Sequence, residues 1–161
     1  MEITKLGEKS LRIKSKNATF IVDPLPKSEA NAFIFTTAPE VLPENLSLYG
    51  PGEFEIAGVS IKAERAGETV SYDLLEDGRR ILVLAKPTLV KDYETEEYNA
   101  VILALNEKVD DAVLSNISSE LVVLYGDEAQ IALDPQNVKK AEKINLKKTE
   151  ELKGFTIFLT K

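Results

Sequence analysis

The chain has 161 residues, of which 43% are hydrophobic and 29% charged, a composition typical of one soluble globular domain. Its formal net charge of −7 excludes a general binder of the nucleic-acid backbone, because such a protein needs a surplus of basic residues on one face. The chain contains no cysteine and no histidine, which excludes a disulfide framework, thiolate chemistry and the commonest zinc ligand.

No apolar run approaches the ~20 residues that a membrane helix needs, and the first residues lack the pattern of a signal peptide. We therefore expect a cytoplasmic protein that has neither nucleic acid nor a membrane among its partners. One group of lysines near the end of the chain is interpreted as a solvated face: Lys139, Lys140, Lys143, Lys147 and Lys148.

Short strands are predicted through the first half of the chain. Leu11 and Ile13 alternate with basic residues, which is the period of a half-buried strand within residues 2–23. Residues 32–35 form a buried-strand candidate, and the prolines within 36–45 indicate a loop. Further strands are expected at 46–49, 53–56, 59–64, 69–75 and 80–85.

The segment Gly50-Pro51-Gly52 has the residues of a tight turn. Phe54 and Ile56 then alternate with glutamates, and Gly58 interrupts the run before it resumes. This pattern predicts two short strands around a bend.

Helical signals appear only in the second half. Apolar residues within 107–117 recur at helical spacing, and Asp134-Pro135 is typical of a helix start, here of a helix to about Glu142. An irregular segment with up to one helical turn is expected at 87–98, and one or two helical turns at 127–133. Strands are expected at 99–105, 121–125, 143–147 and 155–159. Together these predictions describe one α/β (α+β) domain over residues 1–161 with a dominant sheet.

Several of these segments together resemble one branch of the metallo-β-lactamase superfamily, the branch similar to L-ascorbate-6-phosphate lactonase. Gly50–Val59 resembles the branch's GPGEYE-GGV turn, Phe20–Pro24 its ILIDP strand end, and Leu74–Leu82 its hairpin beside the sheet. The resemblance covers nearly the whole chain. It implies a trimmed four-layer αββα sandwich with its site along one edge, where the loops after the strands converge.

The metal motif of that family, H-x-H-x-D-H, falls on the loop after residue 36. Aligned on Thr36, the ligand positions are occupied by Thr37, Pro39, Val41 and Leu42. Proline, valine and leucine side chains do not ligate a metal. We therefore expect a degenerate member with no metal at this vestigial site.

The remaining ligand positions have also changed. In the family, a further histidine follows the strand at 59–63, and here Glu64 is found at that place. A late histidine of the family would fall near Gly126. Glu8 occupies a position at which family members often have histidine. Lys86 takes the position of the bridging aspartate and so reverses the charge there. One hypothesis is that Lys86 fills the former metal space and pairs with Glu8, Asp23 or Glu64; the other is that it points to solvent.

Two functions stay open at this stage. The first is a non-catalytic binding or structural module without a cofactor, acting on an unknown protein partner or by self-association as a homo-oligomer. The second is a metal-independent, hydrolase-like enzyme with a repurposed pocket around Lys86 and Glu8, in which a desolvated lysine acts as base or nucleophile.

Overall fold

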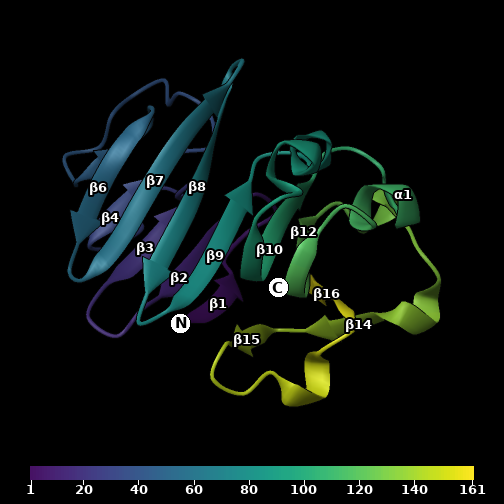
Figure 1. The fold of residues 1–161 in the computed structure, drawn as a ribbon. Coiled ribbons are helices and arrows are strands. Elements are labelled where there is room, and N and C mark those ends of the chain that lie inside the picture. Colours follow the sequence, from purple (N-terminus) through teal and green to yellow (C-terminus); the bar gives the residue numbers. More distant parts are fainter.

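The computed structural model describes residues 1–161 as a sandwich of two large β-sheets (Figure 1). The first sheet has six strands in the order β15-β1-β2-β3-β4-β5. Their bounds are β1 (Glu2–Lys5), β2 (Leu11–Lys14), β3 (Thr19–Val22), β4 (Ala32–Ile34), β5 (Ser47–Leu48) and β15 (Lys143–Asn145). Strands β1 to β3 pair antiparallel, whereas β3 and β4 are parallel, so the carboxyl ends of β3 and β4 reach the same edge.

The second sheet has eight strands in the order β14-β16-β12-β10-β9-β8-β7-β6. Their bounds are β6 (Gly52–Ile56), β7 (Val59–Ala66), β8 (Thr69–Glu76), β9 (Arg79–Leu84), β10 (Glu97–Leu105), β12 (Ser118–Gly126), β14 (Val138–Ala141) and β16 (Thr156–Leu159). Strands β9, β10, β12 and β16 are parallel to one another. A small separate pair joins β11 (Val109–Asp110) to β13 (Ile131–Ala132).

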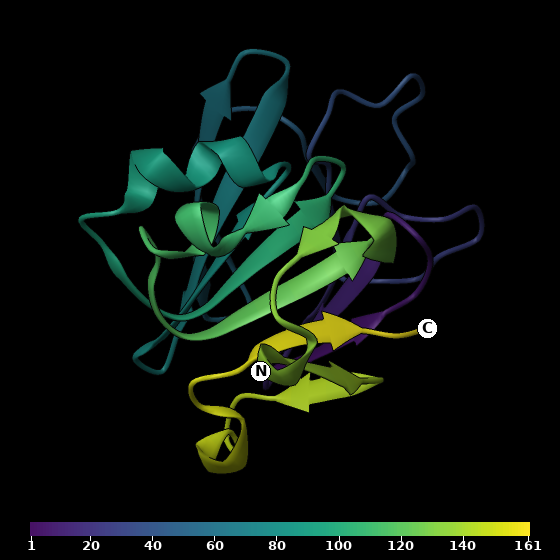
Figure 2. The same cartoon turned by 90° about the vertical axis from the view of Figure 1, so that its right-hand side faces the viewer.

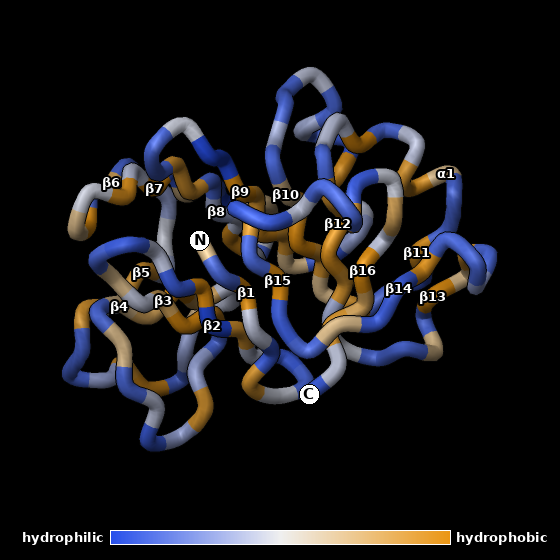
Figure 3. Tube along the Cα trace, turned by 90° about the horizontal axis from the view of Figure 1, so that it is seen from below, coloured by the Kyte–Doolittle hydropathy of each residue, from blue (hydrophilic) through white to orange (hydrophobic).

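The main hydrophobic core lies between the two sheets and contains 27 buried residues from both of them. Strand β7 shows how the sequence produces this core: Val59, Ile61 and Ala63 are buried, while the residues between them are exposed. This alternation places one face of the strand on the core and the other in solvent. Figure 3 shows hydrophobic residues concentrated along the strands and hydrophilic residues along the connecting loops.

The turn at Gly50-Pro51-Gly52 carries the chain from β5 in the first sheet to β6 in the second. Gly52 has a φ of 153°, and a Cβ at this position would lie 3.0 Å from the ring of Phe54. The next bend, at Ala57 and Gly58, has φ values of 49° and 83° and closes the β6–β7 hairpin. The predicted pair of short strands around a bend is therefore confirmed.

The helices of this sandwich are short, and the longest, η1, has seven residues (Figure 2). The α-helix α1 (Asp111–Leu114) and the 3₁₀ segment η1 (Pro87–Tyr93) cover a second cluster of 11 buried residues on the outer face of the larger sheet. The other 3₁₀ turns are η2 (Glu128–Gln130), η3 (Pro135–Asn137) and η4 (Glu150–Leu152). The predicted trimmed sandwich is confirmed, with its helical layers reduced to these turns.

Two helix predictions were wrong in extent. The helix expected over 107–117 is only α1, where the Asp110 carboxylate accepts a hydrogen bond from the Val113 N–H. The predicted cap at Asp134 does form, but the chain after Pro135–Asn137 is strand β14 rather than helix. Strand β14 pairs in parallel with β16, and this tertiary pairing outweighs the local helix-start signal.

The two sheets are joined at the edge where their parallel strands end. The Val70 N–H, in β8, donates a 2.8 Å hydrogen bond to the carbonyl of Thr36, which follows β4. Thr37 and Thr69 also form an isolated antiparallel bridge at this place. This edge is a general location for ligand sites in sheets with parallel strands. No helix in the protein has the length and apolar character needed to span a membrane.

Candidate functional site

A cavity of about 290 Å³ opens at this edge of the sandwich. Residues that follow or end the strands of both sheets line it: Glu8, Lys9, Asp23, Thr36, Thr37, Thr69, Ala85, Ala104, Leu105, Asn106, Tyr125, Gly126 and Asp127. We refer to it as the edge cavity. It lies where the family resemblance predicts the site, because the carboxyl ends of β3, β4, β9, β10 and β12 converge there.

Asp23 is held rigidly at the end of β3. It has a φ of 45°, a left-handed conformation that aspartate adopts more readily than most residues. Its Oδ1 accepts a 2.8 Å hydrogen bond from the Thr36 N–H, and its Oδ2 accepts a 2.5 Å bond from the Thr36 hydroxyl. Burial raises the pKa of this carboxyl, although the two Thr36 hydrogen bonds oppose the shift. Asp23 is thus a partly desolvated carboxylate on the wall of the cavity.

Tyr125 is the most deeply buried polar residue of the cavity wall. Only 1% of this residue, near the end of β12, is exposed, and its hydroxyl forms no hydrogen bond with the protein. The hydroxyl is not one of the fully buried unpaired atoms, which are Thr4 Oγ1 and Arg12 Nε, so it is accessible from the cavity. Burial, and secondarily the charge of Asp23, raises the pKa of the Tyr125 phenol, so the hydroxyl keeps its proton at neutral pH. The cavity therefore contains a protonated hydroxyl donor that has no internal acceptor.

A second buried tyrosine provides the contrast. Tyr72, on β8, is fully buried between the sheets, and its hydroxyl lies 2.6 Å from the carbonyl oxygen of Phe35 and 3.0 Å from that of Leu48. It therefore ties the larger sheet to the ends of β4 and β5. Tyr72 is satisfied internally, as buried hydroxyls usually are, and Tyr125 is not.

Gly126 allows the ends of β10 and β12 to approach closely at the cavity. Its φ is 116°, and a Cβ would lie 3.2 Å from the backbone nitrogen of Leu105. Asn106 holds the neighbouring strand end, since its side-chain amide donates a 2.7 Å hydrogen bond to the carbonyl of Ala85. The wall formed by β9, β10 and β12 is thereby fixed by backbone geometry.

The structure brings together only part of the vestigial site expected from the sequence. Glu8, Thr37 and Gly126 line the edge cavity. Three other positions lie on the loop between β4 and β5: Pro39 is half-buried, and Val41 and Leu42 are exposed. Because these two apolar side chains face solvent, they do not fill the cavity.

Glu64 and Lys86 lie outside the edge cavity. Glu64 is exposed on β7, where it accepts a hydrogen bond from the Tyr93 hydroxyl and forms an ion pair with Lys62. Lys86 is half-buried and forms no salt bridge, so its predicted pairing with Glu8, Asp23 or Glu64 is wrong. The reason is local: Pro87 favours an extended conformation at Lys86, which then precedes η1.

The carboxylates of the edge cavity do not form a metal centre. Glu8, Asp23 and Asp127 line it, but the protein has no group of three or more acidic, histidine or cysteine side chains placed to hold a metal ion. Zinc sites in proteins use nitrogen and sulfur donors in preference to such a set. The residues present therefore do not fit the dinuclear metal centre that the family resemblance implies.

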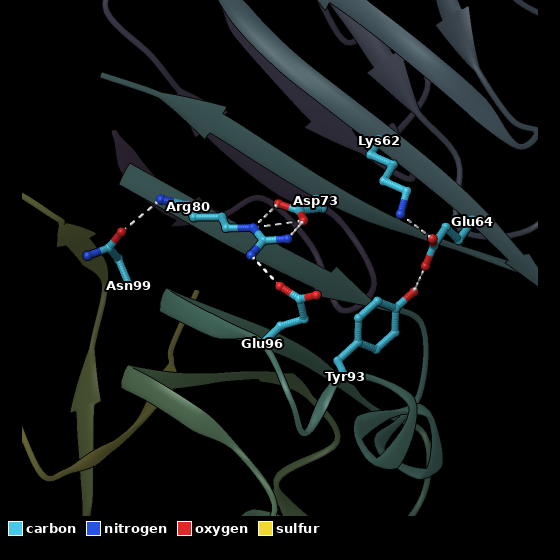
Figure 4. Close-up of polar contacts among 7 residues, drawn as sticks. All are labelled: Lys62, Glu64, Asp73, Arg80, Tyr93, Glu96 and Asn99. Atoms are coloured by element: carbon cyan, nitrogen blue, oxygen red, sulfur yellow. Dashed lines mark hydrogen bonds and ion pairs between the residues drawn. The ribbon is translucent and has the colours of Figure 1, made fainter. Parts of the chain in front are cut away.

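A separate polar cluster lies on the outer face of the larger sheet (Figure 4). Arg80 on β9 binds Asp73 on β8 with hydrogen bonds of 2.5 to 3.0 Å and binds Glu96 at 2.8 Å. Its guanidinium also lies 4.6 Å from the ring centre of Tyr98. We call these four residues the Arg80 cluster. Its charged groups are partnered with one another, which is typical of a structural element.

Comparison with known proteins identifies the fold. No family model and no curated protein matches the sequence. Among solved structures, a Thermotoga maritima protein assigned to the zinc-dependent hydrolases of the metallo-β-lactamase superfamily aligns with a TM-score of 0.67 and 11% identity, over 99% of this chain and 100% of that one. The metallo-β-lactamase fold protein YhfI from Bacillus subtilis aligns with a TM-score of 0.59 and 7% identity, over 99% and 96%.

A third structure is zinc-bound PqqB from Methylobacterium extorquens, with a TM-score of 0.55 and 11% identity, over 92% of this chain and 82% of that one. At such identities, the similarity establishes the fold alone. The protein has the metallo-β-lactamase fold.

Proposed function

We propose that this protein is a non-catalytic binding module of the metallo-β-lactamase fold that has lost the metal site of the family. The observation that carries the proposal is the composition of the edge cavity. It lies at the edge of the sandwich where the resemblance leads us to expect the site, yet it contains hydroxyl groups, one amide, one ammonium group and dispersed carboxylates rather than a metal-binding group. The positions expected to hold metal ligands after β4 are Thr37, Pro39, Val41 and Leu42.

The alternative of a metal-independent enzyme receives less support. It requires a desolvated Lys86 beside Glu8, but Lys86 does not line the cavity with Glu8. The basic side chain that does line the cavity is Lys9, which is exposed. An exposed lysine is not activated by desolvation as a base or nucleophile.

A protein partner, including a second copy of this chain, is a second candidate. The loop and strand from 36 to 49 expose large apolar side chains at Val41, Leu42, Leu46 and Tyr49, and Val41 is 81% exposed. Apolar side chains grouped in this way are typical of interaction surfaces. Such a contact is compatible with a ligand in the edge cavity, since Val41 and Leu42 do not line it.

A screen for hydrolysis tests the proposal. The purified protein is assayed for phosphodiesterase and lactonase activity, with and without added zinc or manganese, beside Asp23→Asn. We expect no turnover above the rate without protein under any condition. Metal-dependent turnover that Asp23→Asn abolishes would overturn the proposed function.

A further inference from the structure

The edge cavity has a charge and hydrogen-bonding pattern that selects among ligands. Three carboxylates line it, from Glu8, Asp23 and Asp127, against a single ammonium group, from Lys9. The excess negative charge favours a cation and opposes phosphates and carboxylates. Because the carboxylates lie on separate loops and do not form a metal-binding group, an organic cation fits this arrangement better than a metal ion does.

Tyr125 adds an independent requirement. Its side chain is buried, its hydroxyl is protonated, and no acceptor in the protein pairs with that hydroxyl. This hydroxyl is not among the fully buried unpaired atoms of the protein, so it is accessible from the cavity that Tyr125 lines. A ligand with an oxygen acceptor at this place therefore replaces solvent as its hydrogen-bond partner. Asp23 offers the complementary group, because each of its oxygens accepts only one hydrogen bond from Thr36 and retains capacity for another.

The apolar residues of the lining favour a ligand whose middle segment is apolar. Ala85, Ala104 and Leu105 line the cavity together with the polar groups. The volume of about 290 Å³ lies at the lower end of the range of ligand pockets, about 300–1,000 Å³. Methylene groups against these residues gain burial without needing a hydrogen bond.

We propose that the edge cavity binds a small organic ammonium ion in which an alkyl segment separates the ammonium group from a hydroxyl or carbonyl oxygen. The ammonium group contacts the carboxylates, and the oxygen accepts the hydrogen bond of Tyr125. This inference rests on the proposed function, namely that the cavity binds a ligand rather than a catalytic metal.

Three probes with the same six-carbon chain test the charge preference by isothermal titration calorimetry: 6-amino-1-hexanol, 1,6-hexanediol and 6-hydroxyhexanoate. We expect the aminoalcohol to bind at least ~10-fold more tightly than the diol, and the hydroxy acid to bind most weakly. Equal binding of the aminoalcohol and the diol, preference for the hydroxy acid, or no binding of any probe would overturn the inference.

Variants of the protein test separately the hydrogen bond from Tyr125 and the contact between the ammonium group and the carboxylates. Tyr125→Phe should weaken aminoalcohol binding by about 5-fold, the effect of one lost hydrogen bond, whereas the matched variant Tyr72→Phe should leave the affinity unchanged. Glu8→Gln, at an exposed position, should weaken binding of the aminoalcohol and not of the diol. Unchanged affinity in Tyr125→Phe and Glu8→Gln would place the probe elsewhere and contradict the assignment.

The outcomes distinguish this inference from the proposed function. Preference for the anionic probe leaves a binding module with a different ligand class. Metal-dependent hydrolysis in the screen above overturns the binding module itself.

Discussion

The edge cavity and the Arg80 cluster are both rich in charged and polar side chains, but they differ in how these groups are satisfied. In the Arg80 cluster, the guanidinium binds two carboxylates and stacks on an aromatic ring. In the edge cavity, the Tyr125 hydroxyl has no partner and Glu8 forms no salt bridge. Asp127 also forms no salt bridge, and one of its oxygens accepts a 2.9 Å hydrogen bond from the Ala129 N–H. Groups that satisfy one another stabilise the fold, whereas groups left without partners at a cavity remain available for a ligand.

This difference predicts opposite responses to mutation. Substitutions in the Arg80 cluster should lower the free energy of unfolding, and substitutions of unpartnered groups in the edge cavity should alter binding with little effect on stability. The four predictions below compare the effects of such substitutions, each with its own control or reference.

Arg80→Ala should have the largest effect, lowering the free energy of unfolding by about 2–3 kcal/mol. The variant leaves the Asp73 carboxylate, whose side chain is 12% exposed, without its cation. Urea denaturation followed by circular dichroism measures the change. The control is Lys62→Ala, which breaks the exposed pair with Glu64 and should leave the midpoint unchanged. A similarly small effect for Arg80→Ala would show that the cluster is not structural.

Gly126→Ala should have the next largest effect, lowering the free energy of unfolding by about 2 kcal/mol. The substitution introduces a Cβ at a φ of 116° and within 3.2 Å of the Leu105 backbone nitrogen. Gly78→Ala is the matched control, since Gly78 also has positive φ but nothing lies within 4 Å of its Cβ position. Thermal unfolding of both variants measures the difference, and an equal loss would mean that the close approach at β10 costs nothing beyond the backbone strain.

Substitutions of the two buried tyrosines should have smaller effects on the free energy of unfolding, and the two effects should differ from each other. Tyr72→Phe should lower the free energy of unfolding by about 1–2 kcal/mol, because the carbonyls of Phe35 and Leu48 lose their hydroxyl partner. Tyr125→Phe should change it by less than about 0.5 kcal/mol, since its hydroxyl has no partner to lose. Urea denaturation compares the two, and a large loss in Tyr125→Phe would indicate an internal hydrogen bond.

The smallest expected effect is the change with pH in the stability difference between Asp23→Asn and the native protein. Folding raises its pKa above the ordinary value near 3.8, so its contribution to stability is fully present below that pH and is lost as pH rises through the folded pKa. Asp23→Asn removes this titration. The variant should therefore gain stability relative to the native protein as pH increases from 3 to 7, measured by urea denaturation at each pH. A difference that is constant with pH would contradict the raised pKa.

The sheet framework was predictable from the sequence because it follows local patterns. The alternation of Val59, Ile61 and Ala63 and the turn residues at Gly50 to Gly52 specify strands and bends within a few residues. Helix extent was harder to predict, since the segment after Asp134 has a good cap yet pairs with β16. Such pairing depends on residues distant in the chain.

The edge cavity was predicted only in part. Glu8, Thr37 and Gly126 were found through the family resemblance, which also placed Lys86 and Glu64 there wrongly. Asn106 was missed, and Tyr125 was not singled out although it adjoins Gly126, the position near the late histidine. Nothing in the sequence marks these two residues apart from their position at strand ends. That position is the available signal, since the carboxyl ends of parallel strands meet at one edge. The cytoplasmic location and the partners stay predictions.

Metal content tests the central claim about the edge cavity most directly. The purified protein would be dialysed to equilibrium against a small excess of zinc and analysed for bound metal by elemental analysis, with Asp23→Asn as the comparison. If the cavity is a site for an organic ligand, we expect no stoichiometric zinc in either protein. One or two equivalents of zinc in the native protein, lost in Asp23→Asn, would contradict the claim and restore a metal centre built on Asp23.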